Sequence, residues 1–134
     1  MSDVLTFSIP GKPEYIQMVR LAIGSIACKA DFDVEKVDDI EVAVSEACTL
    51  VTCHGYEGWG EKYELVVVID DNGRMEITVS ETAALHNIEK KCKQCARCPE
   101  DGDLAVFVIN SLMDEIEIMC SEKGNRKIRM VKNK

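Results

Sequence analysis

The sequence has few aromatic residues and few prolines, and it lacks any long apolar segment. Aromatic side chains make up 5% of the 134 residues, and there are 3 prolines and 1 tryptophan. No stretch approaches the roughly 18 consecutive apolar residues that a membrane-spanning helix needs. The first residues, MSDVLTFSIPGKP, also lack the basic segment and the apolar run of a secretion signal. We therefore expect a cytoplasmic protein that does not span a membrane.

Positive charge is scarce as well. The chain carries 16 lysines and arginines against 24 aspartates and glutamates, which gives a formal net charge of −8. Phosphate groups repel such a surface, so neither nucleic acid nor an anionic membrane is expected as the main partner. A protein partner or a small ligand is expected instead. With 46% hydrophobic residues and no internal repeat, residues 1–134 are expected to form a single domain.

Residues 37–56, VDDIEVAVSEACTLVTCHGY, predict a central helix with two different faces. At helical spacing, one apolar stripe suits the face that a helix lays on a sheet: Val37, Ile40, Val44, Ala47, Cys48 and Val51. A second line lies about 120° round from the first on the same geometry: Ala43, Glu46, Leu50, Cys53 and His54. A lone glutamate on such a line is as often an ordinary solvated residue as a functional one. We nevertheless take this second line as the place to look for function.

The remaining elements follow from periodicity and turn residues. Asp33 is the expected N-cap of the central helix. Alternating or continuous apolar residues predict strands, and apolar residues at helical spacing predict further helices. The expected elements are a strand at 4–9, a helix at 13–29, a hairpin of strands 63–69 and 75–79 around Asp70-Asp71-Asn72-Gly73, a helix at 102–115, and strands at 116–120 and 127–131. The basic residues of the last strand are expected to form a solvated sheet face.

Two segments resemble a known family. SEACTLVTCHGY resembles the glutamate-containing helix of the RsbW-like anti-sigma-factor serine kinases, a branch of the Bergerat-fold (GHKL) ATPases whose usual text is close to S-E-A-C-T-N-A-V-x-H-A-Y. GDLAVFVINSLMDE is similar to the family's G-G-L-G-L-F-L-I-x-x-L-M-D-E helix. The resemblance covers nearly the whole chain. It implies a two-layer α/β sandwich of the Bergerat type, with an antiparallel or mixed sheet covered on one face by three helices.

The resemblance also indicates where the chain departs from an active kinase. Glu46 matches the family's catalytic glutamate, but Leu50 stands where an asparagine holds magnesium, and leucine offers no oxygen ligand. In the family, the aspartate of an Asp-x-Gly motif reads the adenine amino group. Here Glu81-Thr82-Ala83 stands in its place, so the acid is longer, and the Cβ of Ala83 would intrude where the adenine ring should approach the backbone.

The third departure concerns the glycines that bring backbone N–H groups to the phosphates in the family. Only Gly102 remains, because Asp103 and Ala105 replace the others, and a carboxylate at a helix N-terminus repels a triphosphate. ATP with magnesium is therefore not expected as a cofactor. Glu46 is then expected to be vestigial.

The segment CKQCARCP at 92–99 places Cys92, Cys95 and Cys98 in two successive C-x-x-C units. This spacing brings three thiolates close enough to share a metal ion or an iron–sulfur cluster. Cys53 is the expected fourth ligand because it lies on the second line of the central helix, and His54 is the runner-up. Three other cysteines fall in apolar stretches where we expect buried thiols: Cys28, Cys48 and Cys120. The alternative is a set of unligated thiols.

These observations predict an anti-sigma-factor-like regulator that has a degenerate ATP site and an iron–sulfur cluster or zinc in its place. By resemblance, its partner is a sigma factor or an anti-anti-sigma protein, and it is expected to be a homodimer. The alternative is an active ATP-dependent serine kinase of the same family, with Glu46 as its catalytic residue.

Overall fold

The computed structural model describes residues 2–51, 62–81, 101–120 and 126–134. The helices and strands follow one another in an order close to the expected one. They are β1 (Asp3–Pro10), a short 3₁₀ helix η1 (Pro13–Tyr15), α1 (Ile16–Lys29), α2 (Val34–Val51), β2 (Lys62–Ile69), β3 (Arg74–Glu81), α4 (Asp101–Leu112), β4 (Glu115–Cys120) and β5 (Arg126–Asn133).

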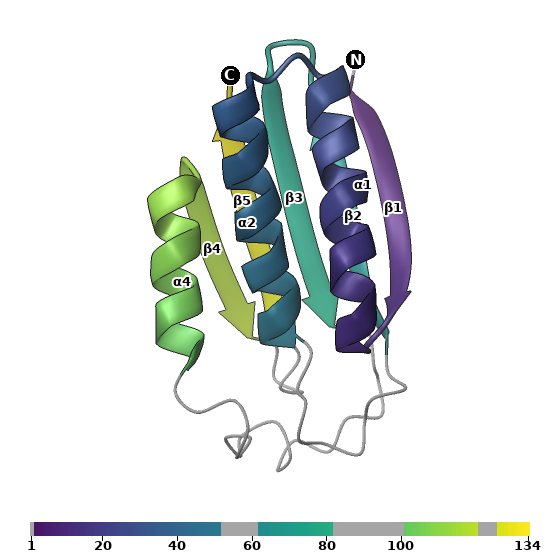
Figure 1. Cartoon of the computed structure of the whole chain (residues 1–134), viewed down its shortest axis with the longest axis vertical. Coiled ribbons are helices and arrows are strands. Elements are labelled where there is room, and N and C mark those ends of the chain that lie inside the picture. The colour runs from purple at the N-terminus through teal and green to yellow at the C-terminus, as the bar shows by residue number, and fades with distance from the viewer. Residues whose placement is uncertain (1, 52–61, 82–100, 121–125) are drawn as a thin grey trace.

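Five strands form one sheet in the order β1-β2-β3-β5-β4, and every neighbouring pair is antiparallel. Helices α1, α2 and α4 lie side by side over one face of this sheet (Figure 1). The predicted two-layer sandwich is therefore confirmed, with an antiparallel rather than a mixed sheet. In the β2–β3 turn, the side chain of Asp70 accepts hydrogen bonds from the backbone N–H groups of Asn72 at 2.9 Å and Arg74 at 3.1 Å. Gly73 completes the turn with a φ of 81°, a conformation that other residues rarely adopt.

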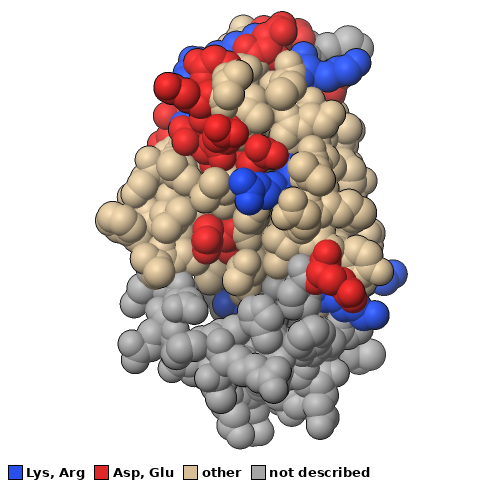
Figure 2. Space-filling view, viewed as in Figure 1, with Lys and Arg blue, Asp and Glu red and all other residues tan. Residues whose placement is uncertain are grey.

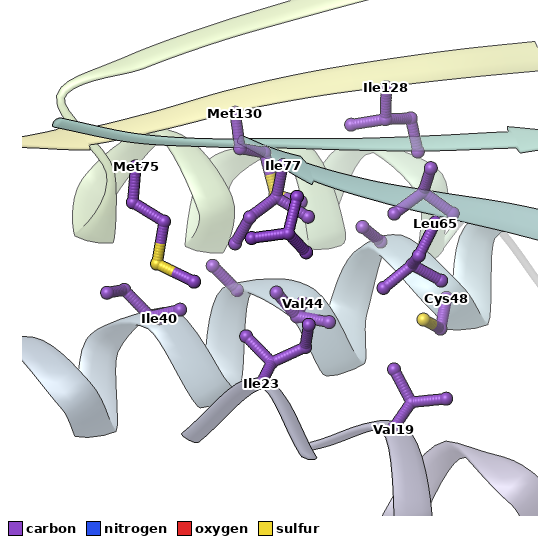
Figure 3. Packing of buried hydrophobic residues seen from close by; sticks show 14 of the residues in the cluster. Val19, Ile23, Ile40, Val44, Cys48, Leu65, Met75, Ile77, Ile128 and Met130 are labelled. Atoms are coloured by element: carbon purple, nitrogen blue, oxygen red, sulfur yellow. The ribbon is translucent and has the colours of Figure 1, made fainter. Parts of the chain in front are cut away.

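The core lies between the helices and the sheet (Figure 3). The predicted stripe of α2 supplies its centre, since Ile40, Val44 and Cys48 are fully buried. They face a layer of strand side chains that are equally buried: Leu65, Val67, Met75, Ile77, Val79, Ile128 and Met130. These strand residues alternate with exposed or half-buried ones, which is the pattern of a sheet with one covered face.

Helix α2 begins as expected. The carboxylate of Asp33 accepts a hydrogen bond from the backbone N–H of Lys36 at 2.9 Å, which confirms Asp33 as the N-cap. The preceding turn contains Asp31 with a φ of 65°, a left-handed conformation that aspartate adopts more readily than most other residues. None of the helices in the described ranges has the length and apolar character required to cross a bilayer.

One expectation about burial is wrong, and one buried charge was not anticipated. Cys28 is exposed rather than buried, because α1 turns Val19, Ile23 and Ala27 towards the core and Cys28 follows Ala27 by about 100° of rotation. Lys132, one residue beyond the predicted strand at 127–131, is only 8% exposed. Alternation along β5 points Lys132 to the helix-covered face, where its ammonium group donates a hydrogen bond to the carbonyl oxygen of Leu112 at the end of α4 and lies 3.5 Å from Asp39.

Replacing a core residue of α2 should be far more damaging than replacing an exposed one. Ile40→Ala should lower the free energy of unfolding by about 2–5 kcal/mol, because it removes buried methyl groups and leaves a cavity. Val34→Ala, at a position of the same helix that is 77% exposed, should change it by less than about 0.5 kcal/mol. Urea unfolding followed by circular dichroism measures both. Similar losses in the two variants would contradict the assigned core.

Candidate functional site

Three elements of the candidate site end at the same pole of the molecule. The C-terminal end of α2, the N-terminal end of α4 and the C-terminal end of β3 meet there (Figure 1). Each carries residues that the sequence singled out: Glu46 and Leu50 on α2, Gly102, Asp103 and Ala105 on α4, and Glu81 at the end of β3. The other predicted site residues lie outside the described residues: Ala83, Cys53, His54, Cys92, Cys95 and Cys98.

The second line of α2 faces α4. Asp39 lies on this side of α2, because Lys132 bridges it to the last turn of α4. Ala43 follows one turn later and is fully buried, so it belongs to the core rather than to a pocket wall. Glu46 continues the same line on helical geometry and is half-buried. Helical geometry therefore puts Glu46 on the side of α2 that faces α4, and its functional role stays a prediction.

Leu50 is the next residue on this line. Its side chain is half-buried and packs against the hydrophobic core. Magnesium requires oxygen ligands in nearly octahedral geometry, and a leucine side chain can supply none. The residue present therefore does not fit a magnesium ion bridged to a nucleotide at this position. Within the described parts of the chain, no group of three or more His, Cys, Asp or Glu side chains is arranged to hold a metal ion.

Glu81 forms the best-defined polar contact of the site. The glutamate is 7% exposed, and its carboxylate accepts a hydrogen bond from the guanidinium Nε of Arg126 at 2.9 Å. Antiparallel pairing explains this contact, since Ser80 lies opposite Lys127 and the next pair is Glu81 and Arg126. The sequence analysis singled out Glu81 but missed Arg126, because the contact depends on the pairing of β3 with β5, which the sequence pattern did not predict. Arg126 thus bonds to one oxygen of the carboxylate at the position where the family resemblance puts the adenine-reading acid.

The first turn of α4 forms the remaining wall. Gly102 and Asp103 belong to this turn, because α4 begins at Asp101. Ala105 is 4% exposed, so its methyl group is buried on the inner side of the helix. The N-terminus of a helix attracts anions through its free N–H groups. Two of the first three residues of α4 are acids in the sequence, Asp101 and Asp103.

A buried thiol and a buried phenol lie together below this site. Cys48 of α2 is fully buried and Tyr63 of β2 is 1% exposed, and the two side chains interact. Burial raises the pKa of Cys48 from 9.0 to about 12, and the interaction with the Tyr63 hydroxyl partly opposes this. Burial and the neighbouring Cys48 also raise the pKa of Tyr63. Cys48 is thus the small hydrophobe that the sequence predicted, and it is not a reactive thiolate at neutral pH.

The raised pKa of Cys48 predicts a specific loss of stability in alkali. The folded protein holds the Cys48 proton up to about pH 12, whereas the unfolded chain releases it near 9.0, so the free energy of unfolding should fall as the pH rises through this window. Cys48→Ala should reduce that slope by up to about 1.4 kcal/mol per pH unit. Urea unfolding at several alkaline pH values measures it in both proteins. An unchanged slope in the variant would contradict the buried neutral thiol.

The chain is similar to known proteins over most of its length. Residues 9–132 match the family of histidine kinase-like ATPase domains. The serine-protein kinase RsbW of Bacillus thuringiensis (strain Al Hakam) is 32% identical over 129 residues, which cover 90% of this chain and 79% of the relative. RsbW of Listeria monocytogenes serotype 4a (strain HCC23) is 29% identical over 130 residues, which cover 91% of this chain and 83% of the relative.

Two solved structures share the fold. The RsbU and RsbW domains of Rv1364c from Mycobacterium tuberculosis superpose with a TM-score of 0.69 at 15% identity, over 98% of this chain. This chain spans about a third, 32%, of that longer one. A chain of the SiaB–SiaC complex from Pseudomonas aeruginosa superposes with a TM-score of 0.68 at 12% identity, covering 95% of this chain and 88% of that one. From the family match and the RsbW relatives together, this chain belongs to the histidine kinase-like (GHKL) ATPase family, in its RsbW-like branch.

Proposed function

We propose that this protein is an anti-sigma-factor-like regulator that acts by binding a sigma factor or an anti-anti-sigma protein, and that residues 1–134 work as one domain in a cytoplasmic homodimer. The RsbW relatives, matched over most of their length, support this role. A structural neighbour that comes from a protein–protein complex also supports it. The net charge of −8 favours protein over nucleic acid as the partner.

One observation carries the proposal that the regulator works without phosphoryl transfer. Leu50 packs its side chain on the core at the position where the family resemblance puts a magnesium ligand. Without a metal ion, the charge of the transferring phosphoryl group is not neutralised and the triphosphate is not positioned. The Glu81–Arg126 ion pair and the buried methyl group of Ala105 support the same proposal, because the family resemblance puts an adenine-reading acid and a phosphate-binding glycine at these two positions.

An active serine kinase is the second candidate. The relatives are named serine-protein kinases, and Glu46 is half-buried beside α4, where the family resemblance puts the catalytic glutamate. A matched pair of proteins, wild type and Glu46→Gln, separates the two candidates. The substitution removes the basic carboxylate while preserving the size of the side chain.

We expect no transfer of labelled phosphate from ATP and magnesium to the serine of an anti-anti-sigma protein, at the same background level for the wild type and Glu46→Gln. The physical reason is that the leucine at position 50 supplies no ligand for the metal that phosphoryl transfer requires. Autoradiography of the acceptor protein measures the transfer. Phosphorylation by the wild type that is lost in Glu46→Gln would establish the kinase and overturn the proposal.

We further propose that four cysteines bind a metal ion or an iron–sulfur cluster in place of the magnesium and nucleotide of the family. Cys53, Cys92, Cys95 and Cys98 would form one four-thiolate site for an iron–sulfur cluster or zinc, since both accept this ligand set. The C-x-x-C-x-x-C spacing supports the three ligands from 92–98, and the helical periodicity of the sequence assigns Cys53 to the same line as Glu46 and Leu50. Neither Cys48 nor Cys28 suits the fourth position. Cys48 is buried in the core with a raised pKa, and Cys28 is exposed on α1.

Substitution of single cysteines tests this set. After anaerobic purification, Cys53→Ser and Cys95→Ser should each lose a large and similar share of the bound metal, because each removes one of four thiolates. Cys28→Ser is the matched control and should retain all of it. Metal analysis and the ultraviolet–visible spectrum give the readout. Full metal content in Cys53→Ser would show that the fourth ligand is wrong, and full content in all three variants at 92, 95 and 98 would show that no such site exists.

A further inference from the structure

Helix α4 lies at the outer end of the row of helices formed by α1, α2 and α4 (Figure 1). Its inner residues Ala105 and Ile109 are 4% and 0% exposed, whereas Leu104 and Phe107 on its outer side are 61% and 67% exposed. Figure 2 shows this outer side as an uncharged bulge at the left. Within the described residues, the packing that holds α4 in place is therefore on its inner face.

Lys132 joins α4 to two other elements. Alternation along β5 points this side chain to the helix-covered face, and the residue is only 8% exposed. Its ammonium group donates a hydrogen bond to the carbonyl oxygen of Leu112, the last residue of α4. The same ammonium group lies 3.5 Å from the carboxylate of Asp39 on α2. One side chain of the sheet thus contacts both helices.

The contact with Leu112 matters because of the way in which helices end. The last carbonyl groups of a helix have no partner within it and carry a partial negative charge. Helix α1, at the other end of the row, meets this need locally, since the backbone N–H groups of residues 30–32 donate to carbonyl oxygens of its last turn. Helix α4 instead bonds its final carbonyl to the side chain of Lys132. The end of α4 therefore depends on a tertiary contact, whereas the end of α1 is closed by its own chain.

The burial of Lys132 gives this contact its strength. A buried ammonium group needs compensating partners, because desolvation penalises an isolated charge. Asp39 supplies the opposite charge and Leu112 supplies the acceptor. Hydrogen bonds to charged groups contribute more than those between neutral groups. Lys132 therefore fixes the C-terminal end of α4 relative to α2.

We propose that Lys132 is a clamp that holds α4 closed on α2, and that α4 opens as a unit of its own, to an extent that the clamp sets. A segment that is packed through one face and exposed on the other opens locally at a lower free energy than the core. Opening of α4 would uncover the side of α2 on which helical geometry puts Glu46. This inference goes beyond the proposed function and does not rest on it.

Native-state hydrogen–deuterium exchange followed by NMR tests the clamp. Lys132→Met removes the ammonium group and keeps an unbranched side chain that fits an apolar environment. Arg129→Met is the matched control, because Arg129 lies on the same strand but on the uncovered face of the sheet, in an ion pair with Glu76. The amides of β2 and β3, inside the sheet, report opening of the whole fold, and the amides of α1 report the other outer helix.

In Lys132→Met, the amides of residues 106–112 should exchange about tenfold faster than in the wild type, because a charged hydrogen bond is lost. Exchange in α1, β2 and β3 should change by less than about twofold. Arg129→Met should leave α4 unchanged. Equal acceleration of α4, α1 and the strands would show that Lys132 supports the whole core and would overturn the proposal. Exchange of α4 at the wild-type rate, or an equal effect of Arg129→Met on α4, would overturn it as well.

Asp39→Asn keeps the test decisive if Lys132→Met fails to fold. The side chain of Asp39 is 36% exposed, so the neutral amide can be hydrated and the fold should tolerate it. This variant keeps the hydrogen bond from Lys132 to Leu112 and removes the opposite charge. Exchange should rise by about twofold to fivefold in residues 106–112 alone. Unchanged exchange in α4, or acceleration throughout the fold, would overturn the proposal.

Discussion

The packing of one face of α2 on the antiparallel sheet fixes the position of everything else in the structure. Ile40, Val44 and Cys48 are buried against the strands, so the angular position of α2 is set by its apolar stripe. Helices α1 and α4 then pack on its two flanks. Because a helix presents a new side chain every 100°, fixing the stripe also fixes where Glu46 and Leu50 lie. The candidate site follows from core packing in this direct sense.

Most of the fold could be predicted from the sequence because local pattern and tertiary burial agree. The buried stripe of α2, the alternating burial in β2 and β3, and the N-cap at Asp33 all appear in the structure as the sequence pattern predicts. The failures were positions where the sequence does not say which neighbour covers a side chain. Cys28 sits in an apolar run but faces away from the core, and the burial of Lys132, on which the sequence pattern made no prediction, depends on its hydrogen bond to the carbonyl oxygen of Leu112 at the end of α4.

The site was predictable only in part, for a different reason. Sequence pattern and family resemblance indicated Glu46, Leu50 and Glu81, and the structure brings their elements to one pole. The pairing of Glu81 with Arg126 depends on the register of strands 45 residues apart, which no local pattern reveals. The exposure of Phe107 is of the same kind, since a phenylalanine in an apolar helix predicts burial, and only the packed structure shows which face is left over.

These features bear on one proposal: the residues at the positions of the family's ATP site no longer suit a nucleotide, with Leu50 packed on the core and Arg126 bonded to the carboxylate of Glu81. The central claim is that this chain keeps the fold of its family while its nucleotide site no longer holds magnesium with ATP. Calorimetric titration of the purified protein with ATP, with and without magnesium, tests it most directly. The account predicts no measurable heat of binding and no effect of magnesium. A magnesium-dependent affinity in the micromolar range would contradict it.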